Sequence, residues 1–372
     1  MRESFDCPNC GAPVPLSEDP PATVRCPHCS TTVIVPPDLR RRAEARPVVI
    51  HVAGGGTRPI SPQVGRMVVV LIVAAVVMSA AIGVAGMVLG IGAAVAPAAI
   101  PALLATSGPS HVLAFGGEGI GPGRFTDARR IGVDGQGRVY IGEYQGGRVQ
   151  VFTPEGEFLT QWFADTEFPL TGMAVSREGE VFTVQRGELL RRDGLTGDDL
   201  GVVRYEGGQD FEDVAMQADG GLITGWVLFQ DDLVVFDSEG DWVLTIPEAV
   251  SGQTGDSELS LRVAADGRGD LLALGQFNTA VFRYDARGRF VNRFGSSGDE
   301  PGQLRAPMSI AVDGQGRVHV GDIWGVEVFD RDGRFLERLE VEGSPFGLTF
   351  DDDGYLWVVN GTQVMKYEGA FE

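Results

Sequence analysis

The chain has 372 residues, enough for two or more domains, and a formal net charge of −21. The charge is unevenly spread: residues 1–109 hold 8 basic and 6 acidic side chains, whereas residues 110–372 hold 22 and 45, a net charge of −23. Because an acidic domain repels phosphate backbones, we expect no nucleic-acid partner for the C-terminal part.

All four cysteines lie within the first 29 residues, as the pairs Cys7/Cys10 and Cys26/Cys29, each with the spacing C-x2-C. This pattern is typical of a four-thiolate zinc site, because each pair can present two sulfurs to one tetrahedral ion. Two disulfides, or two redox-active pairs, are the alternative interpretations. We predict a four-cysteine zinc domain over residues 1–36 that metal binding folds, since so small a piece cannot build its own core.

The two cysteine pairs stand in the motifs Cys7-Pro-Asn-Cys10-Gly11 and Cys26-Pro-His-Cys29. These motifs resemble the knuckles of a zinc ribbon of the rubredoxin type, which implies short strands at Thr23–Arg25 and Thr31–Val35. His28 is expected to be a loop residue, because four thiolates already complete the zinc shell. A closed site of this kind has a structural or partner-binding role.

Residues 37–66 form a predicted linker that is rich in arginine, proline and glycine. The next 39 residues, 67–105, contain no charged side chain. About 20 apolar residues suffice for one membrane crossing, and Pro97 and Pro101 indicate where the helix ends. We therefore predict a transmembrane helix over 67–96 and a juxtamembrane linker over 97–109.

The orientation of this span follows from its flanks. The arginines before it predict a cytoplasmic N-terminus and an extracytoplasmic C-terminal domain, as in a single-pass protein of the cell membrane. A cleaved signal peptide is the weaker alternative, because the apolar stretch is long and 66 residues precede it. Gly86 and Gly90 form a GxxxG pattern that would allow a helix-mediated dimer, although glycine-rich helices often contain this pattern by chance.

Residues 110–372 contain an internal repeat. The segment from Ile131 to Glu143, with the sequence IGVDGQGRVYIGE, recurs from Ile310 to Asp322 as IAVDGQGRVHVGD. Weaker copies give anchor positions separated by 42, 41, 49, 47 and 38 residues: Asp134, Ser176, Gln217, Asp266, Asp313 and Asp351. Units of this length with four short strands predict an all-β, six-bladed β-propeller.

The last unit contains only three of the four expected strands, and the third of these lies around Met365. An isolated apolar segment, His111–Phe115, stands before the first unit. We predict that this segment is the outer strand of the last blade and closes the ring, which removes exposed sheet edges.

Two segments carry a family resemblance. Phe115-Gly-Gly-Glu-Gly-Ile-Gly-Pro-Gly-Arg-Phe125 and Phe294-Gly-Ser-Ser-Gly-Asp-Glu-Pro-Gly-Gln-Leu304, each followed by a strand that ends in Val-Asp, resemble NHL repeats. The resemblance covers residues 110–370 and implies a propeller that binds proteins, RNA or small ligands, or in a minority of cases is an enzyme. Its acidity speaks against the RNA-binding type. The glycine-rich stretch 116–123 precedes a strand, so it is not a dinucleotide loop.

In such a propeller one face carries the loops from second to third strand and from fourth strand to the next blade. The ends of the second strands are then expected to surround the mouth of the ring on this face. The six candidate residues are Glu143, Gln185, Trp226, Gln276, Asp322 and Asn360. They predict a site for a polar ligand or for calcium, unless they are simply solvated loop residues.

Related six-bladed propellers include calcium lactonases, with Glu, Asn and Asp ligands, and histidine-rich lyases. The C-terminal domain holds only His111 and His319, which speaks against the lyase type. We expect a membrane-anchored binding, scaffold or sensor protein of bacterial type, with a protein or envelope ligand on the loop face and a cytoplasmic partner for the zinc ribbon. A calcium-dependent hydrolase acting through Glu143, Asp322 and Asn360 is the alternative.

Overall fold

The computed structural model describes residues 4–6, 12–15, 23–28, 32–34, 111–208, 210–226 and 230–368. Three predicted zinc ligands, Cys7, Cys10 and Cys29, lie outside these ranges, as do the linker 37–66, the predicted membrane helix 67–96 and the segment 97–109. Within the described ranges, no helix has the length and apolarity needed to cross a membrane.

The N-terminal described segments form two short antiparallel hairpins. Strand β1 (Ser4–Asp6) pairs with β2 (Pro13–Pro15), and β3 (Thr23–Arg25) pairs with β4 (Thr32–Ile34). The second hairpin matches the two strands predicted there to within one residue at each end. The first hairpin was not predicted, because proline disfavours a strand interior. Cys26 follows β3 directly and is buried.

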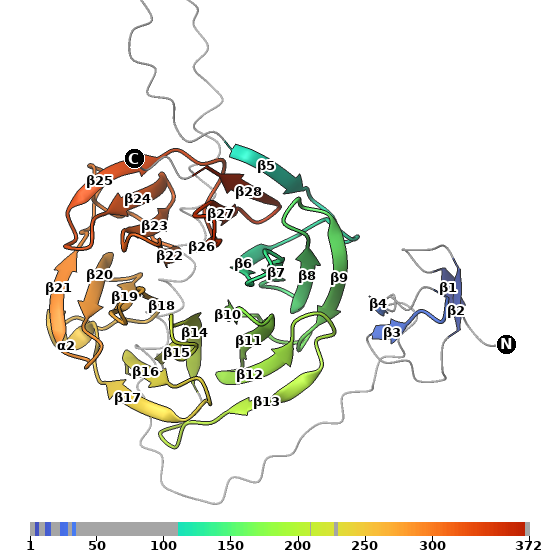
Figure 1. Ribbon diagram of the computed structural model, residues 1–372, viewed down its shortest axis with the longest axis horizontal. Coiled ribbons are helices and arrows are strands. Elements are labelled where there is room, and N and C mark those ends of the chain that lie inside the picture. The colour runs from blue at the N-terminus through green and yellow to red at the C-terminus, as the bar shows by residue number, and fades with distance from the viewer. Residues whose placement is uncertain are drawn as a thin grey trace, which may run out of the picture. The chain divides into compact units, whose positions relative to one another are not determined.

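The rest of the described chain forms six four-stranded antiparallel sheets arranged as a ring (Figure 1). Each sheet is one blade, and in five of the six its strands follow chain order from the centre outward; in the sixth the order is β26-β27-β28-β5. This confirms the predicted all-β, six-bladed propeller. The strands of blades 1 to 3 are β6 (Ala128–Val133), β7 (Val139–Glu143), β8 (Arg148–Phe152), β9 (Phe158–Phe163), β10 (Gly172–Val175), β11 (Glu180–Gln185), β12 (Glu188–Asp193), β13 (Asp199–Val203), β14 (Phe211–Met216), β15 (Leu222–Trp226), β16 (Asp232–Phe236) and β17 (Trp242–Ile246).

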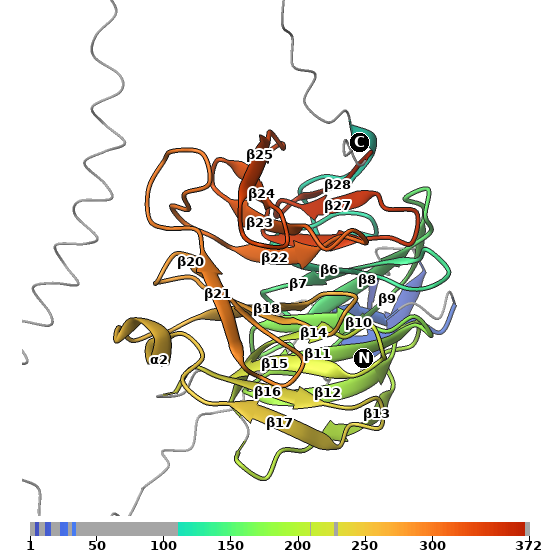
Figure 2. The same ribbon diagram turned by 60° about the vertical axis from the view of Figure 1, so that its left-hand side comes forward.

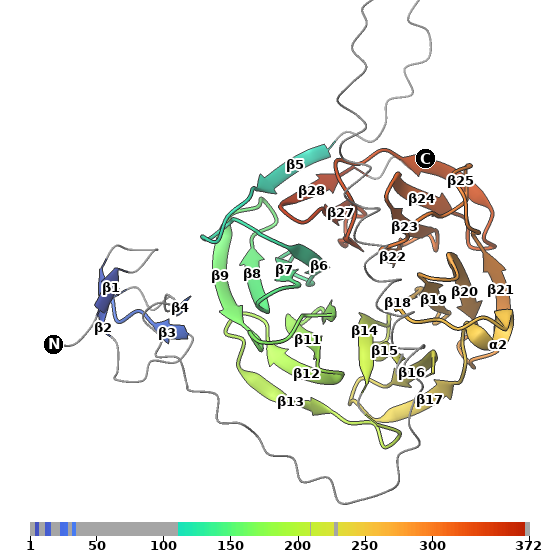
Figure 3. The same cartoon turned by 180° about the vertical axis from the view of Figure 1, so that it is seen from behind.

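Blades 4 to 6 complete the ring, as the reverse view in Figure 3 also shows. A one-turn helix, α2 (Ser251–Thr254), lies in the long connection before blade 4, at the outside of the ring in Figure 2, and accounts for the largest repeat step. The strands are β18 (Leu261–Ala265), β19 (Leu271–Gly275), β20 (Ala280–Tyr284), β21 (Phe290–Phe294), β22 (Ser309–Val312), β23 (Val318–Asp322), β24 (Gly325–Phe329), β25 (Phe335–Leu339), β26 (Gly347–Phe350), β27 (Leu356–Val359), β28 (Gln363–Tyr367) and β5 (His111–Gly116).

Burial falls from the inside of each blade to the outside. All residues of β7, β8, β19, β20, β23 and β24 are buried, whereas the outer strands β13, β17 and β21 are largely exposed. A strand that is covered on both faces reads as a continuous apolar run rather than an alternating one. This explains sequences such as Leu271-Leu-Ala-Leu-Gly in the second strands.

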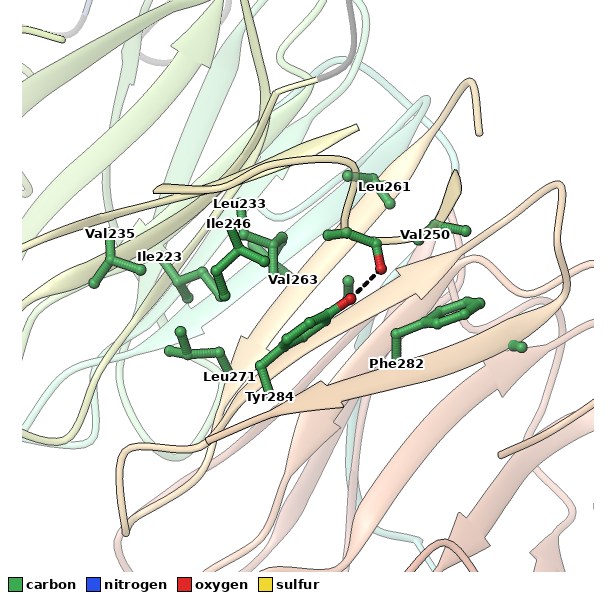
Figure 4. Close-up of a cluster of buried hydrophobic side chains, with 13 residues drawn as sticks. Ile223, Leu233, Val235, Ile246, Val250, Leu261, Val263, Leu271, Phe282 and Tyr284 are labelled. Carbon is green, nitrogen blue, oxygen red and sulfur yellow. Dashed lines mark hydrogen bonds between the residues drawn. The ribbon is translucent and has the colours of Figure 1, made fainter. Parts of the chain in front are cut away.

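The hydrophobic core lies between neighbouring blades. Figure 4 shows one such layer, in which Ile223 and Leu233 of blade 3 pack together with Leu271 and Phe282 of blade 4. Tyr284 belongs to the same layer, and its buried hydroxyl donates a hydrogen bond to the carbonyl oxygen of Ala249. Each blade therefore buries its faces only against its neighbours, so the ring must be complete for the core to be complete.

Ring closure takes place in blade 6. Strand β5 pairs antiparallel with β28, so that Phe115 lies opposite Val364 and Ala114 opposite Met365. The Phe115 ring also packs on Phe152 of blade 1, with the ring centroids 4.7 Å apart. This confirms the predicted closing strand.

We use the name loop face for the side of the ring that holds the turns between second and third strands and the connections between blades. Antiparallel pairing within every blade places these segments on one side. The described segments of the loop face are 117–127, 144–147, 164–171, 186–187, 204–208, 210, 230–231, 247–260, 276–279, 295–308, 323–324, 340–346 and 360–362.

Candidate binding site in the central channel

The six residues predicted for the mouth occupy equivalent places in the fold. Glu143, Gln185, Trp226 and Asp322 are the last residues of the second strands of their blades, and Gln276 and Asn360 follow such strands directly. All six therefore lie at the loop face. None of them belongs to the described residues that line the central channel.

The side chain of Glu143 is buried and binds the connection between blades 6 and 1. Its Oε1 accepts hydrogen bonds from the backbone N–H and the hydroxyl of Thr126, at 2.7 and 2.9 Å. Its Oε2 forms an ion pair with Arg148. Both carboxylate oxygens are thus used to hold this connection against the blade.

Gln185 and Asn360 hold their own connections in the same way. The side-chain oxygen of Gln185 accepts a hydrogen bond from the N–H of Asp165 at 2.9 Å. Its side-chain NH2 group donates to the carbonyl oxygens of Asp165 and Phe168, in the connection between blades 1 and 2. Asn360 donates to the carbonyl of Glu342 at 2.9 Å and accepts the N–H of Gln363.

The remaining three residues also contact the loops beside them. Gln276 donates to the carbonyl of Pro307 at 2.6 Å and bonds the Ser260 hydroxyl. Asp322 accepts the N–H groups of Arg305 and Ala306 through Oδ2, at 2.8 and 2.9 Å. Trp226 packs edge-on to Tyr205 with the ring centroids 6.1 Å apart.

The central channel is lined by the innermost strands β6, β10, β14, β18, β22 and β26, and it encloses a cavity of about 230 Å³. Four residues of the lining lie at one level near the loop face, because each pairs with the residue just before a predicted mouth residue: Arg130, Asp213, Ser309 and Gly347. Charged side chains therefore enter the channel at its loop-face end, while the opposite end is lined by apolar residues such as Val133, Val175 and Val312.

Two of the channel strands are irregular at this level. The register shifts between Ala128 and Arg130 in β6, and between Phe211 and Asp213 in β14. Each shift inserts one extra residue, Arg129 or Glu212, next to a charged channel residue. Bulges of this kind redirect side chains and are common beside functional sites.

Arg130 is a buried cation with few partners in the described structure. Only 7% of it is exposed, and its single hydrogen bond runs from Nη2 to the carbonyl of Thr171. Its Nε has no hydrogen-bond partner among the described residues, and no described carboxylate oxygen lies within 4.0 Å of its guanidinium. Burial, followed by the charge of Arg262, lowers the pKa of Arg130 to about 9, although Asp213 and Glu212 act in the opposite direction.

The other charges at this level are better satisfied. Arg262 forms an ion pair with Glu212 at 3.3 Å, and Arg129 forms one with Asp127 at 2.6 Å. Asp213 accepts one hydrogen bond, from the N–H of Val263 to Oδ2 at 3.1 Å. The lining itself thus holds three arginines and Asp213, while the carboxylates of Glu212 and Asp127 pair with two of these arginines from beside the lining, so that the six formal charges cancel.

This cluster was not identified from the sequence. Arg129-Arg130 and Glu212-Asp213 read as ordinary surface pairs, since no local pattern shows that a strand start faces a channel. The signal lies in the aligned repeats, where units one and three place charged pairs at the start of the first strand. Only the ring brings these pairs together, because they are 83 positions apart (213 minus 130).

The polar side chains of the described lining are those of Arg129, Arg130, Arg262, Asp213, Ser309 and Thr349. The described lining contains no histidine, cysteine or lysine. Its buried serine, Ser309, donates its hydroxyl to the carbonyl of Pro345 at 2.6 Å. An activated nucleophile would instead need a neighbouring base as its hydrogen-bond partner.

The fold is shared with several solved propellers. A gluconolactonase from Xanthomonas campestris matches with a TM-score of 0.53 and 17% identity, over 70% of this chain and 99% of the other. The calcium-binding protein regucalcin from Agrobacterium tumefaciens matches with a TM-score of 0.51 and 13% identity, over 69% and 96%. A luciferin-regenerating enzyme matches with a TM-score of 0.53 and 10% identity, over 69% of this chain and 95% of the other.

The likeness is one of fold. At these identities the comparison places the chain among six-bladed propellers and does not assign an activity. No family model matches the sequence, and no curated protein matches it either.

Two of these neighbours are described as a calcium-binding protein and a gluconolactonase, and a calcium site would need several acidic ligands close together. In the described ranges, no group of three or more His, Cys, Asp or Glu side chains is placed to hold an ion. Glu143 uses Oε1 to hold Thr126 of the connection between blades 6 and 1, and Oε2 to pair with Arg148 of its own blade. Asp322 keeps one buried oxygen, Oδ1, without a described partner, but one carboxylate oxygen is far from the six to eight ligands that calcium takes.

Proposed function

We propose that this chain is a membrane-anchored binding protein, a scaffold or a sensor, whose extracytoplasmic propeller takes its ligand or partner on the loop face. The observation that carries this proposal is the buried pair Arg130 and Asp213 at the loop-face end of the channel. Both line the channel without an ion pair among the described residues, and the Nε of Arg130 is buried without a described hydrogen-bond partner. Convergent polar groups in a concave, otherwise apolar cavity are the usual mark of a small-ligand site.

A calcium-dependent hydrolase is the second candidate, and the fold of the gluconolactonase neighbour favours it. Against it stands the use of Glu143 and Asp322 as hydrogen-bond acceptors for the connections between blades. A ligand set for calcium would require several of these contacts to be given up, at the expense of the loops that they hold.

The two candidates differ in their response to calcium. For a binding protein we expect the melting temperature of the propeller to be the same, within about 1 °C, in calcium and in chelator, because no ion contributes to folding. A melting temperature that falls on chelation in the parent, and no longer responds to calcium in Glu143→Gln, would establish the hydrolase-type site instead. Glu155→Gln, an exposed glutamate of the same blade, is the matched control.

The anchor and the N-terminal domain complete the proposal. The uncharged stretch 67–96 would hold the chain in the cell membrane, and the cysteines Cys7, Cys10, Cys26 and Cys29 would bind Zn²⁺ in the cytoplasm. The buried position of Cys26 directly after a hairpin strand agrees with a knuckle ligand. In this arrangement the ribbon would contact a cytoplasmic partner, while the propeller contacts its own partner across the membrane.

A further inference from the structure

We infer that the loop-face end of the central channel binds a small zwitterion of the α-amino acid class, with the ligand's carboxylate on Arg130 and its ammonium group on Asp213. This inference rests on the proposed binding function and adds the chemical class of the ligand. It starts from two buried charges that do not pair with each other.

Arginine and aspartate are seldom buried unless they are paired. Arg130 and Asp213 are each only 7% exposed. They line the same channel and influence one another electrostatically, yet no ion pair joins them. A buried charge without a partner is strongly unfavourable, so this arrangement calls for a molecule between the two groups.

The neighbouring charges do not fill this role. Arg262 forms an ion pair with Glu212, and Arg129 forms one with Asp127. The Glu212 carboxylate also accepts the N–H of Leu261 at 2.9 Å, which fixes it on blade 4. Among the described charges at this level, Arg130 and Asp213 are the two left without an ion pair.

Charge balance then selects the class of ligand. A simple anion would satisfy Arg130, but it would leave Asp213 unpaired and would have to approach a domain with a net charge of −23. A simple cation would satisfy Asp213 and leave Arg130 unpaired. A zwitterion satisfies both, meets no net repulsion, and offers a carboxylate for the planar donors of a guanidinium.

The channel also limits the size of the ligand. Its volume of about 230 Å³ admits a small molecule, and the walls below the charged level are aliphatic, from Ile131, Val175 and Ala215. An amino acid with its charged groups at the loop-face end would direct its side chain into this apolar part. Small aliphatic amino acids therefore fit best.

The test is calorimetric titration of the purified full-length chain with alanine and valine. Acetate and ethylamine, which each carry one half of the zwitterion, and glucose, an uncharged polar molecule, are titrated as comparison ligands. We expect saturable binding of the amino acids and at least tenfold weaker binding of both half-ligands. Removal of a charge-assisted hydrogen bond corresponds to a loss of about tenfold to a hundredfold.

Arg130→Gln and Asp213→Asn keep the size and polarity of the two side chains and remove their charges. Each is expected to weaken alanine binding by about tenfold or more. Arg334→Gln is the matched control, because the side chain of Arg334 is 78% exposed. This variant should bind alanine with the affinity of the parent.

Thermal unfolding separates a ligand role from a structural role. Because Arg130 lacks an ion pair in the described protein, Arg130→Gln should melt without ligand at or above the temperature of the parent. If it melts clearly lower, Arg130 is a structural cation and the inference is wrong.

Other outcomes bear on the two proposals differently. Acetate binding as tightly as alanine, or no amino acid binding at all, would overturn the zwitterion. Glucose binding that Arg130→Gln abolishes would also overturn it, while leaving the channel as a binding site. The calcium and chelator experiment described above addresses the binding function separately.

Discussion

At the scale of single residues, the repeat is held by one aspartate in the turn between the first and second strands. In blades 1, 5 and 6 the side chain of this aspartate accepts one or two hydrogen bonds from backbone N–H groups of its own turn, and one from a side chain six positions further on. The three donors are the hydroxyl of Tyr140, the ring of His319 and the indole N–H of Trp357. The sequence predicted the turn positions, and the structure adds that His319 is fully buried against Phe350.

The Asp313–His319 pair makes stability depend on pH. Burial lowers the pKa of His319, although Asp313 acts in the opposite direction. Burial alone would raise the pKa of Asp313, but hydrogen bonds from His319 and Arg317 bring it well below its ordinary value. The unfolded chain therefore takes up a proton on histidine below about pH 6.5 before the folded protein does, and stability falls as the pH falls.

His319→Tyr tests this account, because it copies the arrangement of Tyr140 and Asp134 in blade 1. The parent should lose stability between pH 7 and pH 5, by at most about 1.4 kcal/mol per pH unit for a single proton. The variant should show a shallower slope, measured as melting temperature against pH. His111→Tyr, on an exposed histidine, is the control. Equal slopes in the parent and in His319→Tyr would contradict the prediction.

The positions of the candidate mouth residues could be predicted, but the direction of their side chains could not. Counting along the repeats places Glu143 and Asp322 at strand ends. Whether such a residue faces the channel or the neighbouring connection depends on the pairing of two strands and on the fold of a third segment. Arg130 was missed for the same reason, since only the assembled ring shows which strand starts face the channel.

At the scale of elements, the closing strand is the part that the sequence predicted best. Six repeats, with one strand lacking at the end and one spare strand at the start, allow a single closed arrangement. The bulges in β6 and β14 could not be predicted, because one inserted residue changes the register without changing the apolar pattern.

Phe115→Ala tests how much the closing strand contributes. The ring of Phe115 lies against Phe152 at 4.7 Å and Trp357 at 6.4 Å, so its removal leaves a gap between blades 6 and 1. We expect a loss of about 2 kcal/mol, less than for a fully buried phenylalanine, and a melting temperature lower by about 4–8 °C.

Val112→Ala is the matched control for this experiment. It lies in the same strand and is 51% exposed, so its melting temperature should change by less than about 1 °C. Similar melting temperatures for Phe115→Ala and the parent would show that ring closure does not depend on packing of the closing strand.

At the scale of the whole molecule, the sequence predicted an order of parts that the described residues cover only at its two ends. The propeller is confirmed, and two hairpins lie where the ribbon was predicted. The membrane helix 67–96 stays a prediction. It rests on composition alone. An uncharged stretch bordered by arginines predicts a membrane helix and its orientation, and this prediction does not depend on packing contacts.

A topology experiment tests this order of parts. A reporter enzyme that is active only outside the cytoplasm, fused after Glu372, should be active, whereas the same reporter fused before Met1 should be silent. Replacing the six arginines of the linker 37–66 by glutamine should weaken or invert this difference, because these residues set the orientation. Activity of the N-terminal fusion in the parent would place the zinc ribbon on the other side.

The direction of β5 has a mechanical consequence. His111 lies opposite Tyr367 and Gly116 opposite Gln363, so the chain enters the propeller and leaves it on the side away from the loop face. A force between the entry point and a partner bound at the loop face would act along β5 and load its hydrogen bonds to β28 together. A force that pulls the two chain ends apart would instead break them one after another, beginning at His111. The pairing of β5 with β28 is therefore strong against a force between the entry point and a bound partner, and weak against a force that pulls the two ends of the chain apart.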